Sequence, residues 1–224
     1  MKKFEMPKAK LPKALSLKKF SPKVLRRSLT VFALVMALGG TALIAYPFAT
    51  NMWAARIQNG LKGDFAASVE TYGKVPFHVG DPLTRLEIPR LDVDVIVVEG
   101  TSLSALRAGA GHYPETPLPG QHGNVAIAGH RTTYGKPFNR MDELVPGDKV
   151  ILTTPLGRYT YEIMQRPWVV DDADWSPVDE YPAQGDFLTL TSCHPEGSAA
   201  YRIVARGKLI KSDETIAQAG VTSS

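Results

Sequence analysis

The hydrophobic pattern divides the chain into one long apolar segment near the N-terminus and a body of short alternating segments. Residues 29–48 (LTVFALVMALGGTALIAYPF) carry no charge. At about 1.5 Å per residue, a helix of this length spans about 30 Å, the thickness of the hydrocarbon core of a bilayer. A core helix of the same length would show a polar face, and this segment shows none. The pattern therefore predicts a transmembrane helix.

The charges on either side of the apolar segment predict its orientation. Residues 1–27 hold ten basic residues and one acidic residue, a net charge of +9. Residues 28–224 hold 16 basic and 21 acidic residues, a net charge of −5. The positive-inside rule places the N-terminus in the cytoplasm and the body outside the cell membrane, with a single span. A cleaved signal peptide is the alternative, but its apolar core would be shorter than this run. The lysine-rich tail, interrupted by prolines, is expected to be disordered near anionic lipid.

In the body, short segments rich in branched and aromatic residues alternate with proline and glycine, which is typical of an all-β sandwich or barrel. Turns are predicted at residues 146–148 (PGD) and 153–157 (TTPLG). Short helices are expected at residues 102–107 and 138–144. Strands are predicted over residues 84–88, 93–98, 125–129, 149–153, 158–164, 187–191 and 201–209.

These patterns suggest five parts of the chain. They are a basic cytoplasmic tail (1–28), the transmembrane anchor (29–48), an extracellular stalk leading into the domain (49–80), a folded domain (81–211) and a C-terminal tail (212–224). A short helix over residues 65–71 is expected in the stalk.

One long loop stands out because residues 171–182 have no periodicity and carry five acidic side chains. Long loops without secondary structure are often functional. A solvated acidic loop is the simplest interpretation, and a calcium site is the alternative.

Composition excludes several kinds of protein. The single cysteine, Cys193, forbids a disulfide framework within the chain and any all-cysteine metal site. Because the basic residues gather in the tail while the body is acidic, nucleic-acid binding by the folded domain is not expected. A hydrophobic fraction of 44% with 21% charged residues is ordinary for a globular protein.

Cys193 is the first candidate for chemistry because it ends a strand pattern and is followed by His194 and Pro195. A cysteine nucleophile needs a proton donor for the leaving group and a group that stabilises the oxyanion. His130 follows a clean strand pattern, and Arg202 lies nine residues after Cys193, within reach of a hairpin. On these grounds Cys193, His130 and Arg202 are predicted to form a site. The alternative is that Cys193 is buried and inert.

Two other kinds of site have weaker support. A zinc site built from His112, His122, His130 and Cys193 lacks close ligand spacing. A serine hydrolase would need a Gly-x-Ser-x-Gly elbow, which is missing from the sequence.

Three motifs resemble those of a known family. Residues 189–193 (TLTSC) resemble the sortase signature Thr-Leu-x-Thr-Cys, with serine in place of the last threonine. Residues 128–131 (AGHR) resemble the sortase histidine segment, and Arg202 matches the family arginine. Residues 129–135 (GHRTTYG), 138–144 (FNRMDEL) and 193–195 (CHP) make the chain most like the class E sortases of high-GC Gram-positive bacteria.

The resemblance implies an all-β fold, a closed eight-stranded barrel with short helices, and makes residues 81–211 the catalytic domain of a transpeptidase. Cys193 would attack the Thr-Gly bond of a C-terminal LAXTG or LPXTG sorting motif, and His130 would move the protons. Arg202 would hold the substrate and the oxyanion. Tyr113 matches a class E tyrosine associated with the preference for LAXTG, and Thr191 and Ser192 are expected to be further substrate contacts.

The same resemblance implies the partners of the protein. They would be surface proteins with sorting signals and a lipid-linked peptidoglycan precursor that supplies the amine, with no cofactor or metal. Two alternatives stay open. An L,D-transpeptidase also uses a histidine, a cysteine and an arginine, although its Ser-x-Gly-Cys-x-Arg pattern is missing around Cys193. The other is a membrane-anchored binding module without activity.

Overall fold

The structure is a computed structural model that describes residues 21–67, 72–179 and 185–214. The basic tail, up to residue 20, lies outside the described residues, as do residues 180–182 of the acidic loop and the C-terminal tail from residue 215. The chain forms two compact units, residues 1–44 and 45–224.

Helix α1 (Pro22–Ala67) contains the predicted membrane span and continues well beyond it. It is long and apolar enough to cross a membrane, and its most apolar window is fully exposed. The sequence pattern predicts a helix only over residues 65–71 in the following stalk, but the structure is helical throughout residues 51–67, and residues 68–71 lie outside the described residues. Gly60 and Gly63 each disfavour a helix by about 1 kcal/mol. The three hydrogen bonds that Gln58 makes with the domain, described below, offset this cost.

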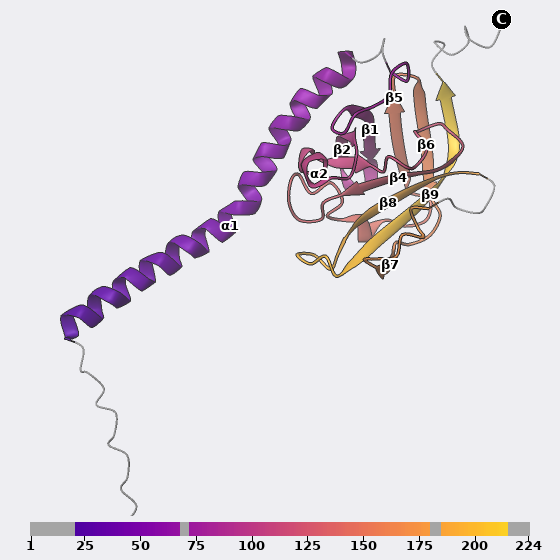
Figure 1. Ribbon diagram of the computed structural model, residues 1–224. Coiled ribbons are helices and arrows are strands. Elements are labelled where there is room, and N and C mark those ends of the chain that lie inside the picture. The colour runs from indigo at the N-terminus through magenta and orange to yellow at the C-terminus, as the bar shows by residue number, and fades with distance from the viewer. Residues whose placement is uncertain (1–20, 68–71, 180–184, 215–224) are drawn as a thin grey trace, which may run out of the picture. The chain divides into compact units, whose positions relative to one another are not determined.

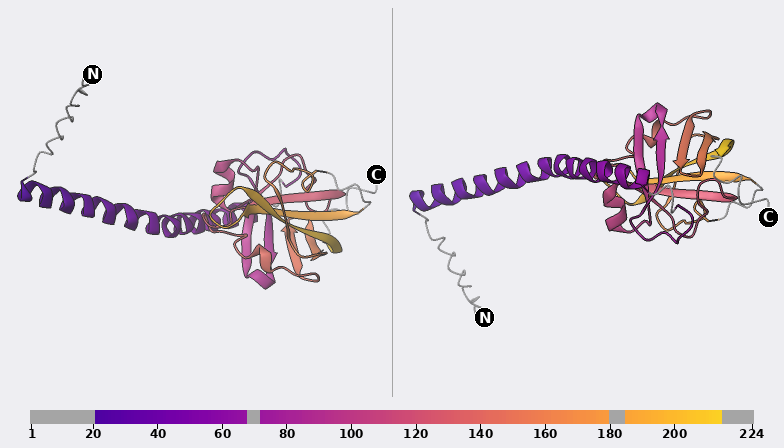
Figure 2. Two further views of the ribbon diagram at one scale, coloured as in Figure 1. Left: turned by 90° about the horizontal axis from the view of Figure 1, so that it is seen from below. Right: turned by 90° about the horizontal axis from the view of Figure 1, so that it is seen from above.

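Nine strands form one sheet that closes into a barrel (Figure 1, with two further views in Figure 2). The sheet order is β6-β5-β1-β2-β3-β4-β8-β9-β7, and β6 also pairs with β9. This last pairing closes a ring of eight strands and leaves β7 outside it, on β9. The predicted closed eight-stranded barrel is therefore confirmed. The strands are β1 (Pro82–Ile88), β2 (Val93–Glu99), β3 (Ala110–His112), β4 (Gly123–Gly129), β5 (Lys149–Thr154), β6 (Gly157–Ile163), β7 (Trp168–Asp171), β8 (Asp186–His194) and β9 (Tyr201–Glu214).

The core fills the barrel with side chains from most of the strands, among them Leu86, Ile127, Leu152, Tyr161 and Leu188. β5 and β6 alternate between buried and more exposed positions, as expected of strands with one face toward the core. β4 and β8 run parallel and are buried on both faces over most of their length. This covered parallel pair carries the candidate site at its carboxyl end.

All seven predicted strands are confirmed, and so are the two turns, which lead into β5 and join β5 to β6. β3 and β7 have no counterpart among the predictions. Helix α2 (Leu103–Ala108) confirms the first predicted short helix. A short 3-10 turn, η2 (Pro89–Leu91), joins β1 to β2.

The second predicted short helix, residues 138–144, is wrong in extent, because only a 3-10 turn, η3 (Met141–Glu143), forms there. Phe138, Met141 and Leu144 are all fully buried. Their spacing of three residues suits a 3-10 turn, in which side chains three apart are aligned, better than an α-helix.

Candidate active site

Cys193 and Arg202 face each other across the β8–β9 hairpin. Cys193 is the next-to-last residue of β8, and its Cα pairs with that of Arg202 in the antiparallel ladder. Directly opposed residues of such a ladder share one face of the sheet, with Cβ atoms about 5 Å apart. Both side chains are half-buried. The hairpin therefore presents the side chains of Cys193 and Arg202 on one face of the sheet.

His130 reaches the same end of the barrel from β4. It follows Gly129, the last residue of that strand. β4 runs parallel to β8, with Ala128 paired to Thr191, so the register two residues further on places His130 beside Cys193. His130 thus comes from a distant part of the sequence to the end of the barrel that carries Cys193 and Arg202.

Tyr113 joins this group from the segment that follows β3. Its backbone N–H donates to the carbonyl of Ala126, and its hydroxyl lies 3.0 Å from Oγ1 of Thr191. Thr191 is buried and lies two residues before Cys193, so both side chains point to the same face of β8. Tyr113 and Thr191 therefore lie next to the thiol on the outer face of the sheet.

Ser192 points the other way. Its hydroxyl donates a hydrogen bond of 2.8 Å to the carbonyl of Gly129, and its side chain is buried. The structure does not bring Ser192 to the face that carries Cys193. Its bond instead ties β8 to β4 directly beside His130.

Burial sets the charge state of His130. It lowers the pKa of this side chain below the ordinary value, and the positive charge of Arg107 lowers the pKa further. His130 is therefore mainly a neutral imidazole at pH 7 and able to accept a proton. Its Nε2 is buried and has no hydrogen-bond partner among the described residues.

Arg202 and Tyr113 are also held in place. Nη1 of Arg202 donates to the carbonyls of Ala199, at 2.8 Å, and Tyr201, at 3.0 Å. Burial raises the pKa of Tyr113, against the opposing effects of its bond to Thr191 and the charge of Arg202. Tyr113 thus stays a neutral phenol that can donate or accept a hydrogen bond.

A shallow hollow opens beside these residues. It has a volume of about 20 Å³, and Tyr113, Thr191 and Arg202 lie in its wall. Its other lining residues are two carboxylates, Asp172 and Asp174, and five apolar side chains, Val170, Trp175, Pro177, Val178 and Val204.

Comparison with known proteins identifies the family of the barrel. A family model described as the sortase domain matches residues 86–210, which include His130, Cys193 and Arg202. The chain belongs to the sortase family. The match starts in β1 and ends in β9, so it spans the whole barrel of this sortase.

Individual relatives support the resemblance to class E. Sortase SrtE1 of Streptomyces coelicolor is 33% identical over 171 residues, 70% of this chain and 48% of SrtE1, so this chain spans about half the length of that relative. A solved structure of sortase E from Streptomyces avermitilis superposes with a TM-score of 0.56 at 35% identity, covering 66% of this chain and 98% of that one. A Clostridium perfringens Sortase D5 transpeptidase superposes with a TM-score of 0.63 at 26% identity, covering 70% of this chain and 99% of that one.

The sequence pattern does not single out Trp175 in this sortase. Its ring lies edge-on to that of Tyr113, with centroids 6.2 Å apart, and it lines the hollow. The only sequence signal for it is its place in the long loop of residues 171–182.

A buried pair behind Tyr113 is a second feature without a clear sequence signal. Nδ1 of His112 lies 2.9 Å from Oε2 of Glu99, and both side chains are buried. The other ring nitrogen of His112 lies 3.1 Å from Oγ1 of Thr116, whose hydroxyl donates to the carbonyl of Tyr113. The pair fixes the segment that presents Tyr113.

The histidines considered for a zinc site have separate partners. His112 contacts Glu99, whereas the exposed His122 contacts Asp186 at 2.8 Å. In the part of the chain that the structure describes, no group of three His, Cys, Asp or Glu side chains could hold a metal ion.

Proposed function

We propose that this sortase is a cysteine transpeptidase in which Cys193 is the nucleophile, His130 the acid and base, and Arg202 the group that stabilises the oxyanion. The observation that carries the proposal is the register of two strand pairs. Cys193 lies opposite Arg202 on β9, and His130 leaves β4 alongside it.

In the first half of the reaction, the neutral imidazole of His130 takes up the proton of the Cys193 thiol, and Sγ attacks the carbonyl carbon of the scissile Thr-Gly bond to form a tetrahedral oxyanion. The guanidinium of Arg202 stabilises the negative charge on that oxygen. When the intermediate collapses, the C–N bond breaks and His130 donates a proton to the leaving glycine amine. A thioester between Cys193 and the threonine carbonyl remains.

In the second half, an amine attacks the thioester carbonyl while His130 takes up its proton. The C–S bond then breaks, a new amide forms, and His130 passes the proton to Sγ, which restores the thiol of Cys193. The half-buried position of His130 suits this alternating role, because its lowered pKa leaves the imidazole free to accept the proton of the incoming amine. The steps need no metal or cofactor.

We propose LAXTG-type sorting signals as the substrate and an amine of the lipid-linked peptidoglycan precursor as the acceptor. Tyr113 and Thr191 lie where they would contact the motif beside its scissile bond. The apolar part of α1 would anchor the protein with its N-terminus in the cytoplasm and its barrel outside. Enzyme, sorting signal and precursor would then meet in one membrane, which raises their effective concentrations.

The decisive experiment uses the full chain in detergent micelles with a quenched LAXTG peptide and an amine acceptor. We expect cleavage that is abolished in Cys193→Ala, together with a covalent peptide adduct on the wild-type protein seen by mass spectrometry. The matched peptide with proline at the second position should react more slowly, and equal rates would refute the proposed preference.

Two outcomes would refute the proposal as a whole. Turnover of a peptidoglycan stem peptide in place of the sorting peptide would identify an L,D-transpeptidase. Binding of the sorting peptide without cleavage would identify an inactive binding module.

A further inference from the structure

The loop that follows His130 brings an aromatic ring against the histidine. The ring centroids of His130 and Tyr134 are 5.2 Å apart, with an angle of 40° between the planes. Nε2 of His130 has no hydrogen bond among the described residues that would fix the imidazole. The contact with Tyr134 is therefore well placed to decide the orientation of the imidazole ring.

Tyr134 is held in turn by helix α1. Its hydroxyl lies 3.0 Å from the hydroxyl of Tyr46, and its ring meets the edge of Trp53 at 6.1 Å and 74°. The guanidinium of Arg107, from α2, lies over the ring at 5.8 Å. Three side chains from two helices thus surround a single residue of the loop.

The backbone of this loop is also held by the helix. Tyr134 has φ +51° and Lys136 has φ +40°, in the left-handed region that residues with a Cβ rarely adopt. Between them, the N–H of Gly135 donates a hydrogen bond of 2.9 Å to Oδ1 of Asn51. A strained conformation of this kind persists only where its surroundings hold it.

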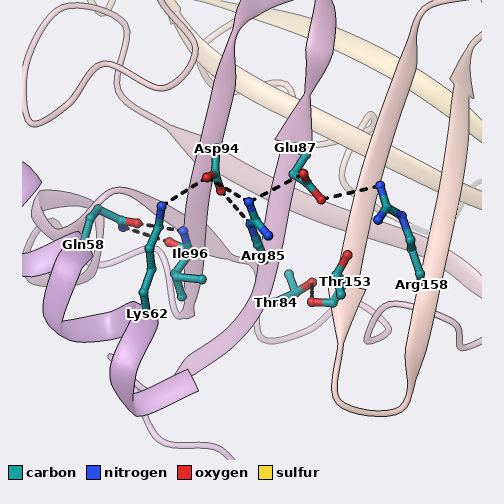
Figure 3. Close-up of polar contacts among 9 residues, drawn as sticks. All are labelled: Gln58, Lys62, Thr84, Arg85, Glu87, Asp94, Ile96, Thr153 and Arg158. Atoms are coloured by element: carbon teal, nitrogen blue, oxygen red, sulfur yellow. Dashed lines mark hydrogen bonds and ion pairs between the residues drawn. The ribbon is translucent and has the colours of Figure 1, made fainter. Parts of the chain in front are cut away.

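The helix itself is firmly bound to the barrel (Figure 3). Nε2 of Gln58 donates to the carbonyls of Ile96, at 3.0 Å, and Ala108, at 2.7 Å, while the N–H of Ile96 donates to Oε1 of Gln58 at 2.7 Å. One turn further on, Lys62 pairs with Asp94 at 3.1 Å. These bonds fix the part of α1 that carries Asn51 and Trp53.

We propose that Tyr134 is a positioning residue for His130, and that Tyr46, Asn51 and Trp53 of α1 support the active site because they hold Tyr134 and its loop in place. The inference rests on the proposed transpeptidase function, in which His130 moves the protons. It gives a second role to a helix that otherwise serves as an anchor and stalk. Tyr46 lies near the C-terminal end of the apolar segment of residues 29–48. The same helix would therefore link the membrane to the loop that positions His130.

The test compares variants of the full chain in detergent micelles. Tyr134→Leu removes the ring and should lower kcat at least tenfold with little change in KM, because the substrate contacts on β8 and β9 are untouched. Tyr134→Phe keeps the ring and should restore kcat to within about threefold of the wild type. Trp53→Ala should lower kcat severalfold. Met52→Ala is the matched control, because the neighbouring Met52 is 60% exposed on the same helix.

A second measurement follows His130 directly and does not need turnover. In the Cys193→Ala background, the NMR signal of the His130 ring should move in Tyr134→Leu and Trp53→Ala and stay in place in Met52→Ala. If the wild type does not cleave the peptide, the proposed function fails while this measurement still decides the positioning role.

Two results would overturn the inference. The first is an unchanged His130 signal in Trp53→Ala. Trp53 is half-exposed, so its replacement does not put folding at risk. The second is an equal loss of kcat in the leucine and phenylalanine variants of Tyr134.

Discussion

Replacing Gly129 with alanine should disturb the fold and the candidate site together. Gly129 ends β4 directly before His130. A Cβ at this position would lie 2.6 Å from Cδ2 and 2.8 Å from Cε2 of Phe138. The ring of Phe138 is fully buried in the core. The backbone of Gly129 is outside the left-handed region, so the expected effect is purely steric.

The expected size of the effect follows from this overlap. Forcing an extra methyl group into a packed core typically costs 1–3 kcal/mol, so we expect Gly129→Ala to lower the free energy of unfolding by about 2 kcal/mol. For a unit of this size, that loss lowers Tm by about 4 to 8 °C. The activity should fall further, up to about 100-fold in kcat, because a displacement of about 1 Å at His130 would misplace the proposed proton donor.

The assay is a double-mutant cycle with urea denaturation and peptide cleavage as readouts. Phe138→Leu removes the ring atoms that the new methyl group would strike, so the double variant should be at least about 1 kcal/mol more stable than the sum of the single changes predicts. Gly63→Ala is the matched control, because a Cβ there meets nothing within 4 Å and the helix should gain about 0.5–1 kcal/mol. Additive effects of the two changes, or wild-type stability of Gly129→Ala, would refute the steric argument.

Two further predictions concern the helix contact and the charge near the histidine. Gln58→Leu should lower the free energy of unfolding by about 3 kcal/mol, because it removes three hydrogen bonds and leaves backbone groups such as those of Ile96 unpaired. A loss below about 0.5 kcal/mol in urea denaturation would contradict this prediction. Arg107→Gln should raise the pKa of His130, since removing a screened positive charge favours the protonated ring. An NMR titration of His130 measures the shift, and an unchanged or lower midpoint would show that Arg107 does not act on the imidazole.

The sequence pattern predicts the seven longer strands well, because each alternates or is rich in branched residues and most of them end next to a proline or glycine. β3 and β7 are different. β3 is only Ala110–His112, with an alanine and a glycine that have little intrinsic preference for a strand, and it forms because β2 and β4 pair with it on both sides. β7, Trp168–Asp171, forms by pairing with one half of β9. Short strands of this kind depend on their neighbours rather than on their own residues.

Part of the candidate site was predictable from local structure, and part of it was not. Cys193 and Arg202 lie close in sequence on either side of a turn, so local structure brings them together. His130 lies more than sixty residues before Cys193, and only the parallel pairing of β4 and β8 places it there. The motif resemblance indicated His130 because it carries information about a fold that spacing alone does not contain.

The sequence by itself determined the apolar anchor segment, the strand-rich body and the single thiol at a strand end, because these depend on local hydrophobic pattern and residue type. Only the tertiary structure decided that the barrel closes through β6 and β9 and that Ser192 points away from Cys193. It also decided that α1 continues to Ala67 and meets the loop of His130 through Tyr134. The physical reason is that hydrogen bonds and ring contacts between distant segments outweigh the weak local preferences that a sequence pattern can report.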